Sequence, residues 1–388
     1  MRKKVNKYKT DNYTFEYVVQ KIKGKPYAII TGFYGLSEEF KYNRHLVVPA
    51  KIDKYNVYAV GGRALSNNYY IKEITFENGI EKLYTNACSH NDNLHTVNLP
   101  ESMRSIGEYA FTYCPSLENV NISEGLERID TGAFECSNLH EIKLPNSLRI
   151  IGSGAFKDTY LSSVHVGPNV EKICASAFSG CRCLENVTIS EGVNTIEDYA
   201  FKECTSLKSI FIPKSVLCLE YGVFDSCRNL ESIHIESDLI NFDTRTDFAY
   251  GCNSLKTITF SETHPYLKVI NGVLYDMSNK TLVRVPPAID SDVVKVPGYI
   301  KNFADCCFDD VALKKLIIKS KNINDLNKTN LREIEEICYV PGSETEKALL
   351  AYKCENIHYE DELKLSPIKT DVSIFLEELT ENSIEKDS

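Results

Sequence analysis

Residues 184–204, LENVTISEGVNTIEDYAFKEC, decide the fold of this chain. The leucine that opens this stretch has equivalents along most of the 388 residues, at Leu94, Leu117, Leu139, Leu161, Leu184, Leu207, Leu230 and Leu255. Successive gaps between these leucines are 23, 22, 22, 23, 23, 23 and 25 residues. A unit of this length cannot bury its apolar face alone, so the repetition predicts a solenoid of stacked coils.

Each repeat predicts a strand followed by a compact turn. In the segment from Leu184 to Ile189 apolar and polar residues alternate, which is the period of a strand. The Ala-Phe-x-x-Cys segment that ends at Cys204 is too short for a full helix, and we expect one helical turn on the opposite wall. The predicted fold class is a β-rich leucine-rich-repeat solenoid of stacked 22–23-residue coils, with a parallel sheet on one wall and short helical turns or strands on the other.

Stacked parallel strands place equivalent residues in columns with a spacing of roughly 4.8 Å. One such column is predicted to be a ladder of phenylalanines at the centre, Phe111, Phe134, Phe156, Phe178, Phe201 and Phe224. Large rings in register, with Ala and Cys beside them, would fill the cross-section of the solenoid.

The frame L-x-x-I-x-I-P, V-x-x-I-G, A-F-x-x-C resembles the BspA-like leucine-rich repeat family over about residues 42 to 358. The ends are also similar to that family: Tyr27 to Phe33 runs into a degenerate first unit, and Val340-Pro341-Gly342-Ser343 precedes a short helix-like stretch. The chain departs from the classical leucine-rich repeat because it lacks a regular Asn ladder after the strand. The resemblance implies binding of host or cell-surface proteins where the family member is exported.

The repeat pattern divides the chain into five segments. We expect an N-terminal β-rich cap with a degenerate first repeat over 1–55, the repeat array over 56–261, a β-hairpin insertion over 262–292, terminal repeats and a closing cap over 293–360, and an acidic tail over 361–388. Asn271-Gly272 between alternating apolar runs is the hairpin signal. The tail holds eight acidic residues and three lysines, and residues 371–379 within it are expected to form a short amphipathic helix. This helix either docks on the terminal repeat or belongs to a flexible tail, or it folds onto a partner.

The sequence favours a cytoplasmic location, with the cell surface or secretion as the alternative. No segment approaches the roughly 18 apolar residues that a membrane span needs. Residues 2–9 are basic, but no apolar segment of the kind found in signal peptides follows them.

Most of the cysteines are explained by the repeat. Of the 14 cysteines, six are assigned to one column, Cys114, Cys136, Cys181, Cys204, Cys227 and Cys252. Parallel stacked side chains supply disulfide geometry poorly, so we expect buried free thiols that behave as small hydrophobic groups. The pairs Cys181-x-Cys183 and Cys306-Cys307 have no neighbouring ligands with zinc spacing, and no metal or cofactor is expected.

Composition and motifs exclude several functions. The sequence has no G-x-S-x-G elbow, no phosphate-binding glycine loop and no H-E-x-x-H, so we expect no catalytic residues and no enzyme. A net charge of −10 and the absence of a basic column argue against nucleic acid.

Three surface columns are predicted. Just after the second apolar cluster, charges alternate in the order Glu81, Arg104, Glu127, Arg149, Glu171, which favours a ladder of surface ion pairs. One outward strand column reads Thr96, Asn119, Glu141, Ser163, Asn186, Ser209, Ser232, Thr257. The column beside it reads Asn98, Asn121, Lys143, His165, Thr188, Phe211, His234, Thr259.

The larger residues among these small polar ones are the candidate partner-binding residues. They are Lys143, His165, Phe211 and His234, together with Leu217, which stands in the charged column. An exposed apolar cluster at Phe211 and Leu217 would be a contact site, but a local fold-back of the irregular next unit could equally cover it.

The sequence as a whole predicts a non-enzymatic protein-interaction scaffold that binds a protein partner through the solenoid surface. We expect a monomer with weak self-association at most. The alternatives are a structural or self-assembling repeat protein, and an exported, adhesin-like cell-surface protein if the chain is processed.

Overall fold

The structure is a computed structural model that describes residues 4–236, 239, 248–261, 264–323, 325–326, 329–352 and 356–359. The predicted acidic tail over 361–388 lies outside the described residues. The chain divides into two units between Pro265 and Tyr266. Unit 1 precedes this division and unit 2 follows it, and each is described by itself.

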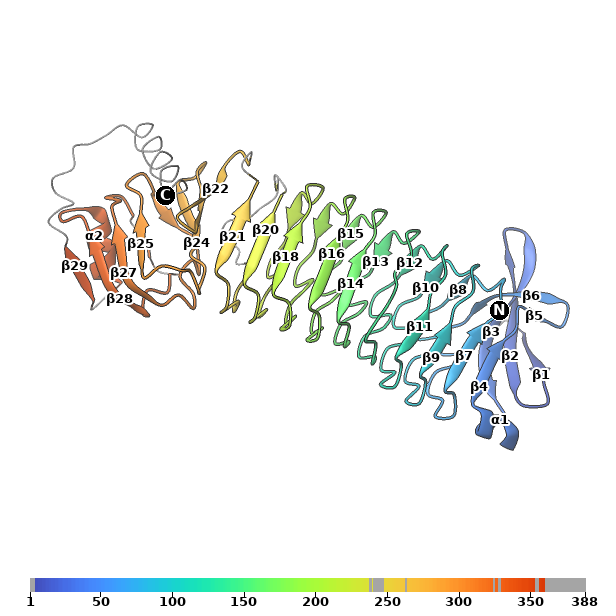
Figure 1. Cartoon of the computed structure of the whole chain (residues 1–388). Coiled ribbons are helices and arrows are strands. Elements are labelled where there is room, and N and C mark those ends of the chain that lie inside the picture. Colours follow the sequence, from blue (N-terminus) through green and yellow to red (C-terminus); the bar gives the residue numbers. More distant parts are fainter. Residues whose placement is uncertain are drawn as a thin grey trace, which may run out of the picture. The chain divides into compact units, whose positions relative to one another are not determined.

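The front wall of unit 1 consists of short parallel strands, one for most coils (Figure 1). They are β4 (His45–Val48), β7 (Glu73–Phe76), β9 (Thr96–Asn98), β11 (Asn119–Asn121), β14 (Ser163–Val166), β16 (Asn186–Ile189), β18 (Ser209–Ile212), β20 (Ser232–Ile235) and β21 (Thr257–Phe260). They pair as three sheets, β4-β7-β9-β11, β14-β16 and β18-β20-β21. Inward residues such as Val97 and Ile210 are buried, so the strand period read from the sequence is confirmed.

The second wall of unit 1 is a ladder of two-residue strands. They are β8 (Lys82–Leu83), β10 (Ser105–Ile106), β12 (Arg128–Ile129), β13 (Ile150–Ile151), β15 (Lys172–Ile173), β17 (Thr195–Ile196) and β19 (Cys218–Leu219). Each strand pairs in parallel with its neighbours, and its second residue points into the core. The predicted fold class, a β-rich solenoid of stacked coils with a parallel sheet on one wall and short helical turns or strands on the other, is confirmed: the structure is a parallel β-solenoid with little helix.

The N-terminal segment continues this ladder and covers its end. It contains β1 (Val5–Lys9), β2 (Thr14–Ile22), β3 (Lys25–Tyr34), α1 (Glu38–Asn43), β5 (Lys51–Ile52) and β6 (Tyr55–Val60). The first three strands pair antiparallel, and β3 then pairs in parallel with β6, which pairs with β8. Phe33 packs against Phe15 and Phe40 at ring-centroid distances of 5.6 and 5.8 Å, so α1 is held against the sheet.

The third wall of unit 1, which we call the turn wall, is formed by the Ala-Phe segments. The prediction that the Ala-Phe segment forms a helical turn is wrong. Tyr109 and Tyr113, which flank Ala110-Phe111, have φ values of +56° and +52°, and left-handed residues interrupt an α-helix. The segment forms successive turns instead, with Ala110 N–H donating to the Gly107 carbonyl. The Phe111 N–H points along the solenoid and donates to the Ala133 carbonyl of the next coil.

The predicted phenylalanine ladder is confirmed. The six rings are fully buried and stack from Phe111 to Phe224, with centroids 5.4–6.0 Å apart and interplanar angles of 5–16°. Each ring buries apolar surface against two neighbouring coils, so the ladder ties consecutive repeats together.

The cysteine column differs from the prediction at one member. Cys136 lies two residues after Phe134, at a left-handed position with φ +56°, and is only half-buried, while Ser137 takes the buried place. The link from Phe134 to Leu139 is one residue shorter than that from Phe111 to Leu117, which explains the shift.

The buried thiols of the column are hydrogen-bond donors as well as small apolar groups. Cys204 Sγ donates to the Phe178 carbonyl of the preceding coil at 3.3 Å, and Cys227 Sγ donates to the Phe201 carbonyl at 3.0 Å. The thiol therefore satisfies a buried carbonyl that would otherwise lack a second partner.

The described residues of unit 2 form two further sheets. The first consists of β22 (Leu267–Ile270), β23 (Val273–Asp276), β24 (Thr281–Arg284) and β26 (Asn302–Phe303). The second consists of β25 (Val293–Val296), β27 (Leu313–Ile318), β28 (Ile334–Tyr339) and β29 (Ile357–Tyr359), all parallel. Helix α2 (Glu344–Ala351) begins after Ser343, whose hydroxyl accepts from the Glu346 N–H as an N-cap.

The Asn271-Gly272 turn joins β22 and β23 as an antiparallel pair. Both turn residues have positive φ, +49° and +78°, which is the conformation of a type I′ hairpin turn. β24 extends this pair and then runs parallel to β26, so the hairpin of the 262–292 range is continuous with the following repeat. The division between the units falls inside that range, at Pro265.

Candidate functional site

The outward residues of the front wall form the two columns expected from the sequence wherever strands pair. Ser209, Ser232 and Thr257 lie side by side in one column. Phe211, His234 and Thr259 lie side by side in the other, which we call the outer column. Because successive side chains of a strand alternate between the two faces, both columns point to solvent from a rigid sheet.

Phe211 and His234 form an exposed aromatic pair on this wall. Their rings stack with centroids 5.2 Å apart and an interplanar angle of 15°. Phe211 remains 49% exposed, so the structure leaves its ring accessible. On its other side, His234 contacts Thr259 through Nδ1 and the Thr hydroxyl at 2.7 Å, and its Nε2 lies 3.7 Å from a Glu236 carboxylate oxygen. These contacts hold the imidazole in place against Phe211.

His165 and Lys143 belong to the same outer column. His165 in β14 pairs with Thr188 in β16, and both side chains are exposed. Lys143 is also exposed, but residues 141–145 have no strand assignment, which leaves the front wall interrupted between β11 and β14.

Leu217 lies away from the other candidates. A turn in which the Val216 N–H donates to the Pro213 carbonyl separates it from β18, and the next residue begins β19 on the second wall. Its side chain is 40% exposed. The structure therefore places Lys143, His165, Phe211 and His234 on the front wall and Leu217 beside the second wall.

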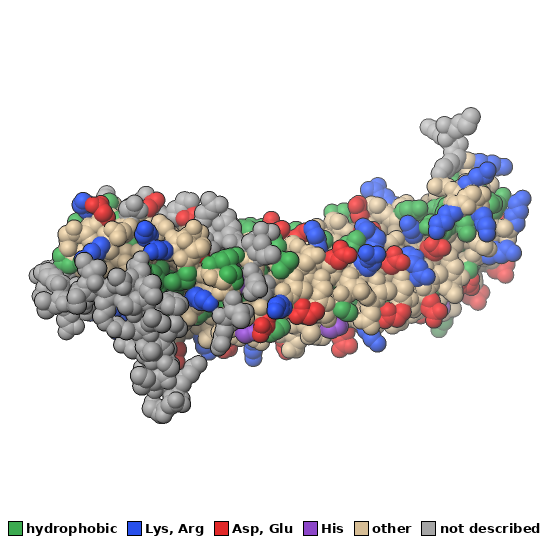
Figure 2. All heavy atoms as spheres, turned by 90° about the horizontal axis from the view of Figure 1, so that it is seen from above, with side chains coloured by type: hydrophobic (Ala, Val, Ile, Leu, Met, Phe, Trp, Pro, Cys, Tyr) green, Lys and Arg blue, Asp and Glu red, His purple; other side chains and the backbone are tan. Residues whose placement is uncertain are grey.

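The charged column that includes Leu217 pairs less regularly than the sequence predicted. Arg149 and Glu171 form an exposed ion pair at 3.5 Å. Arg104 instead turns to the backbone and donates to the carbonyls of Glu101 and Gly125 at 3.0 and 2.9 Å. Figure 2 shows acidic and basic side chains interspersed along the face of unit 1 that it presents.

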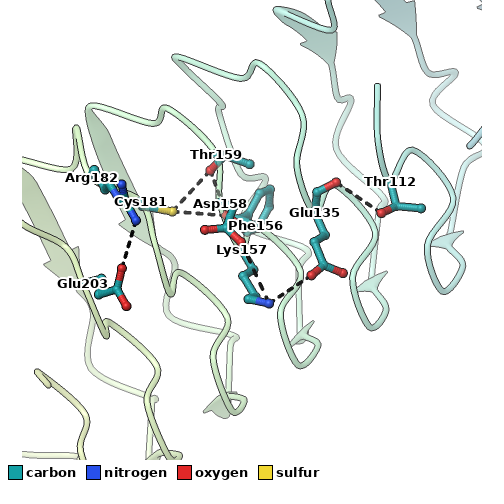
Figure 3. Close-up of polar contacts among 9 residues, drawn as sticks. All are labelled: Thr112, Glu135, Phe156, Lys157, Asp158, Thr159, Cys181, Arg182 and Glu203. Atoms are coloured by element: carbon teal, nitrogen blue, oxygen red, sulfur yellow. Dashed lines mark hydrogen bonds and ion pairs between the residues drawn. The ribbon is translucent and has the colours of Figure 1, made fainter. Parts of the chain in front are cut away.

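A charged cluster on the turn wall was not predicted. It combines Glu135 and Cys136 of one coil with Lys157 and Asp158 of the next. The potential ligand atoms of Glu135, Cys136 and Asp158 all lie within 4.8 Å of one another, which is close enough to share a metal ion. The Lys157 ammonium lies 3.2 Å from Glu135 and 3.9 Å from Asp158 and supplies the positive charge itself (Figure 3).

The pKa shifts in this cluster follow from the same contacts. The hydrogen bond that Lys157 donates to Glu135 raises the pKa of Lys157, and burial followed by the charge of Asp158 raises the pKa of Cys136. With a charged Lys157 ammonium and a protonated Cys136 thiol, these residues form a surface ion-pair cluster. Sequence reasoning missed it because its members are brought together only by the register of adjacent coils.

The buried thiols beneath the turn wall are also held protonated. Burial raises the pKa of Cys114 and of Cys181 to about 12. Cys181 Sγ lies 3.2 Å from the Thr159 hydroxyl and donates to the Phe156 carbonyl at 3.1 Å, contacts that Figure 3 marks with dashed lines. A thiol of this kind is a structural donor, because nucleophilic chemistry requires the thiolate.

The coils, the parallel front wall and the turn wall define a leucine-rich-repeat solenoid. Residues 59–185 and 171–291 match the BspA type leucine rich repeat region, in six copies. The chain belongs to the BspA-type leucine-rich repeat family, and the resemblance drawn from the sequence is confirmed. No curated protein matches the chain significantly.

Solved structures show the same fold. A leucine-rich repeat protein from Bacteroides ovatus has 19% sequence identity and a TM-score of 0.57, with 91% of this chain and 99% of that chain covered. A leucine rich cell surface protein from Faecalibacterium prausnitzii has 19% identity and a TM-score of 0.50, with coverage of 92% and 96%. Among the described residues, no helix combines the length and the apolar character that crossing a membrane requires.

Proposed function

We propose that this protein is a non-enzymatic interaction scaffold that binds a protein partner through the outer column of its front wall. The observation that supports this most directly is Phe211, a large apolar ring left 49% exposed on a sheet face whose neighbouring residues are mostly Ser, Thr and Asn. Aromatic residues that are exposed on a rigid surface are typical anchors of protein interfaces.

The surrounding residues suit the same role. Lys143 and His165 continue the outer column on one side of Phe211 and His234 continues it on the other, so a partner lying along the column meets both apolar and polar groups. Small hydroxyl and amide side chains between them can donate and accept hydrogen bonds without blocking close approach.

Capture experiments with separate variants test this proposal. The full chain is used as bait in extracts of its source organism, as wild type, Phe211→Ser and Tyr221→Ser. Tyr221 is the control because it is 45% exposed but follows β19 on the second wall. We expect a partner that is retained by wild type and Tyr221→Ser and lost by Phe211→Ser, at nearly unchanged thermal stability. Equal capture by all three baits would contradict the proposal.

Leu217→Ser belongs in the same series because it reports on the second wall. Loss of the partner in this variant, with Phe211→Ser unaffected, would move the binding surface there. Light scattering across concentrations tests the self-assembling alternative, for which the mass must rise with concentration. Cell fractionation tests the adhesin-like alternative, which requires the chain at the cell surface.

A further inference from the structure

The outer column changes character over four successive coils. It presents an imidazole at His165, a small side chain at Thr188, a phenyl ring at Phe211 and a second imidazole at His234. Thr188 is thus a small residue with an aromatic residue on the coil at each side, and all three side chains are exposed.

The spacing of rings in this solenoid defines the size of the gap above Thr188. Where rings at equivalent positions of adjacent coils stack face to face, their spacing is regular: Phe211 and His234 stack at 5.2 Å, and Phe156 and Phe178 in the core stack at 5.4 Å. His165 and Phe211 are two coils apart, which is about twice the roughly 4.8 Å strand spacing. One further ring placed between them would therefore stand at stacking distance from both.

The two sides of the gap are held differently. The far face of Phe211 is covered by His234, which is itself fixed by Thr259, so the phenyl ring is braced on one side and open toward Thr188. The front-wall sheets are interrupted between β16 and β18, but β17 and β19 remain paired on the second wall and keep these coils adjacent. Within the described part of the chain, the His165 imidazole makes no hydrogen bond that would hold it away from the gap.

We propose that the gap above Thr188 receives an aromatic side chain of the protein partner, which stacks between His165 and Phe211. The inserted ring would complete a run of four stacked rings, and the gap admits one flat group of ring thickness. Stacked aromatic contacts contribute beyond the area they bury, so this contact would be an anchor of the interface. The inference rests on the proposed function and adds the chemistry of the residue that is recognised.

The sharpest test fills the gap from within. Thr188→Phe places a ring in the gap and should stack with Phe211, so we expect it to block the site while keeping or raising the melting temperature. Asn121→Phe is the matched control, because it adds the same ring in the same column between Asn98 and Lys143, where no ring is present.

The probe is N-acetyltyrosinamide, with N-acetylleucinamide as the apolar control, measured by saturation-transfer NMR on the full chain. We expect ring-proton signals with wild type and Asn121→Phe, and a loss to the level of the leucine probe with Thr188→Phe. Phe211→Leu, which keeps the apolar bulk, should lose the signal as well. Equal signals from both probes, or an undiminished tyrosine signal with Thr188→Phe, would overturn the inference.

The two proposals can fail separately. If Phe211→Ser abolishes partner capture while Thr188→Phe leaves both capture and the tyrosine signal intact, the front wall binds the partner but not through an inserted ring. If Thr188→Phe abolishes the tyrosine signal and no variant of the outer column changes partner capture, the gap binds rings but the proposed scaffold surface is wrong.

Discussion

Two glycines on the turn wall allow backbone strain and steric conflict to be measured separately. Gly132 and Gly154 occupy equivalent places in adjacent coils and have nearly the same φ, +59° and +62°. A Cβ added at Gly132 would lie 2.4 Å from Cε1 of Tyr109, which packs over it from the preceding coil. A Cβ added at Gly154 would meet nothing closer than 3.8 Å.

The expected costs follow from this difference. Gly154→Ala introduces only the strain of an alanine in the left-handed conformation, which lowers the free energy of unfolding by about 1–2 kcal/mol. Gly132→Ala introduces the same backbone strain and must in addition displace the Tyr109 ring. This overpacking lowers the free energy of unfolding by about a further 1–3 kcal/mol. We therefore expect Gly132→Ala to lower the free energy of unfolding by about 2–5 kcal/mol.

Urea unfolding followed by circular dichroism gives both free energies, with the slope on urea concentration expected to stay the same. The decisive variant is Tyr109→Ala, because without the ring the cost of Gly132→Ala should fall to that of Gly154→Ala. Equal costs for the two glycines in the wild-type background, or a cost at Gly132 that Tyr109→Ala leaves unchanged, would refute the packing of Tyr109 over Gly132.

Four further predictions concern the core and the surface. Phe178→Ala removes a buried ring that is stacked on both sides, so it should lower the free energy of unfolding in urea by about 3–5 kcal/mol. A loss smaller than that caused by a substitution of an exposed residue would contradict the ladder. Cys183 is exposed and should react with iodoacetamide at pH 8 in the native protein, whereas Cys181, whose pKa burial raises to about 12, should react only after unfolding, as peptide mass spectrometry can show. Because its pKa is raised, the Cys181 thiol binds its proton more tightly in the folded state than in the unfolded state. The stability that this proton contributes is complete below pH 9.0 and is lost as the pH rises toward 12. Cys181→Ala should therefore reduce the loss of stability at alkaline pH. Glu171→Gln should change the free energy of unfolding by well under 1 kcal/mol at low and high salt, because its ion pair with Arg149 is exposed, and a larger change would show that the pair sets the register.

The repeat period was sufficient to predict the core because the same neighbours recur in every coil. A phenylalanine at one position of each unit has no alternative to stacking on its equivalents, and the observed rings from Phe111 to Phe224 follow directly. The strand period is equally local, since alternation within Leu184 to Ile189 is enough to assign the faces.

The turn wall was less accessible to sequence reasoning. Tyr109, Tyr113 and Glu203 adopt positive φ although their side chains give no signal for it. Inter-coil hydrogen bonds, such as those from the Tyr113 N–H to the Glu135 carbonyl and from the Glu203 N–H to the Asp225 carbonyl, are formed in that geometry. A conformation that depends on contacts between coils cannot be read from one repeat taken alone.

The candidate site shows the same limit in another form. Phe211 and Leu217 are six positions apart and looked like one apolar cluster, but the turn at Pro213–Val216 places them beside different walls. Phe211 and His234 are 23 positions apart and are in contact. In a solenoid, closeness on the surface is set by the column a residue occupies, and neighbours in the sequence are often separated by a corner.

The same organisation favours the positions where an outward column changes its residue type as the residues that would contact a partner. A core position is constrained by identical neighbours above and below, so Phe178 cannot vary without a cavity. An outward front-wall position is constrained less, by its fit to a pleated sheet and by contacts with its column neighbours such as that between Phe211 and His234. The order of small and aromatic residues along the outer column can therefore vary at a smaller cost in stability than the order of core residues. Phe211 remains exposed beside the small side chain of Thr188, and under the proposed function this is the surface that a ring of the partner would cover.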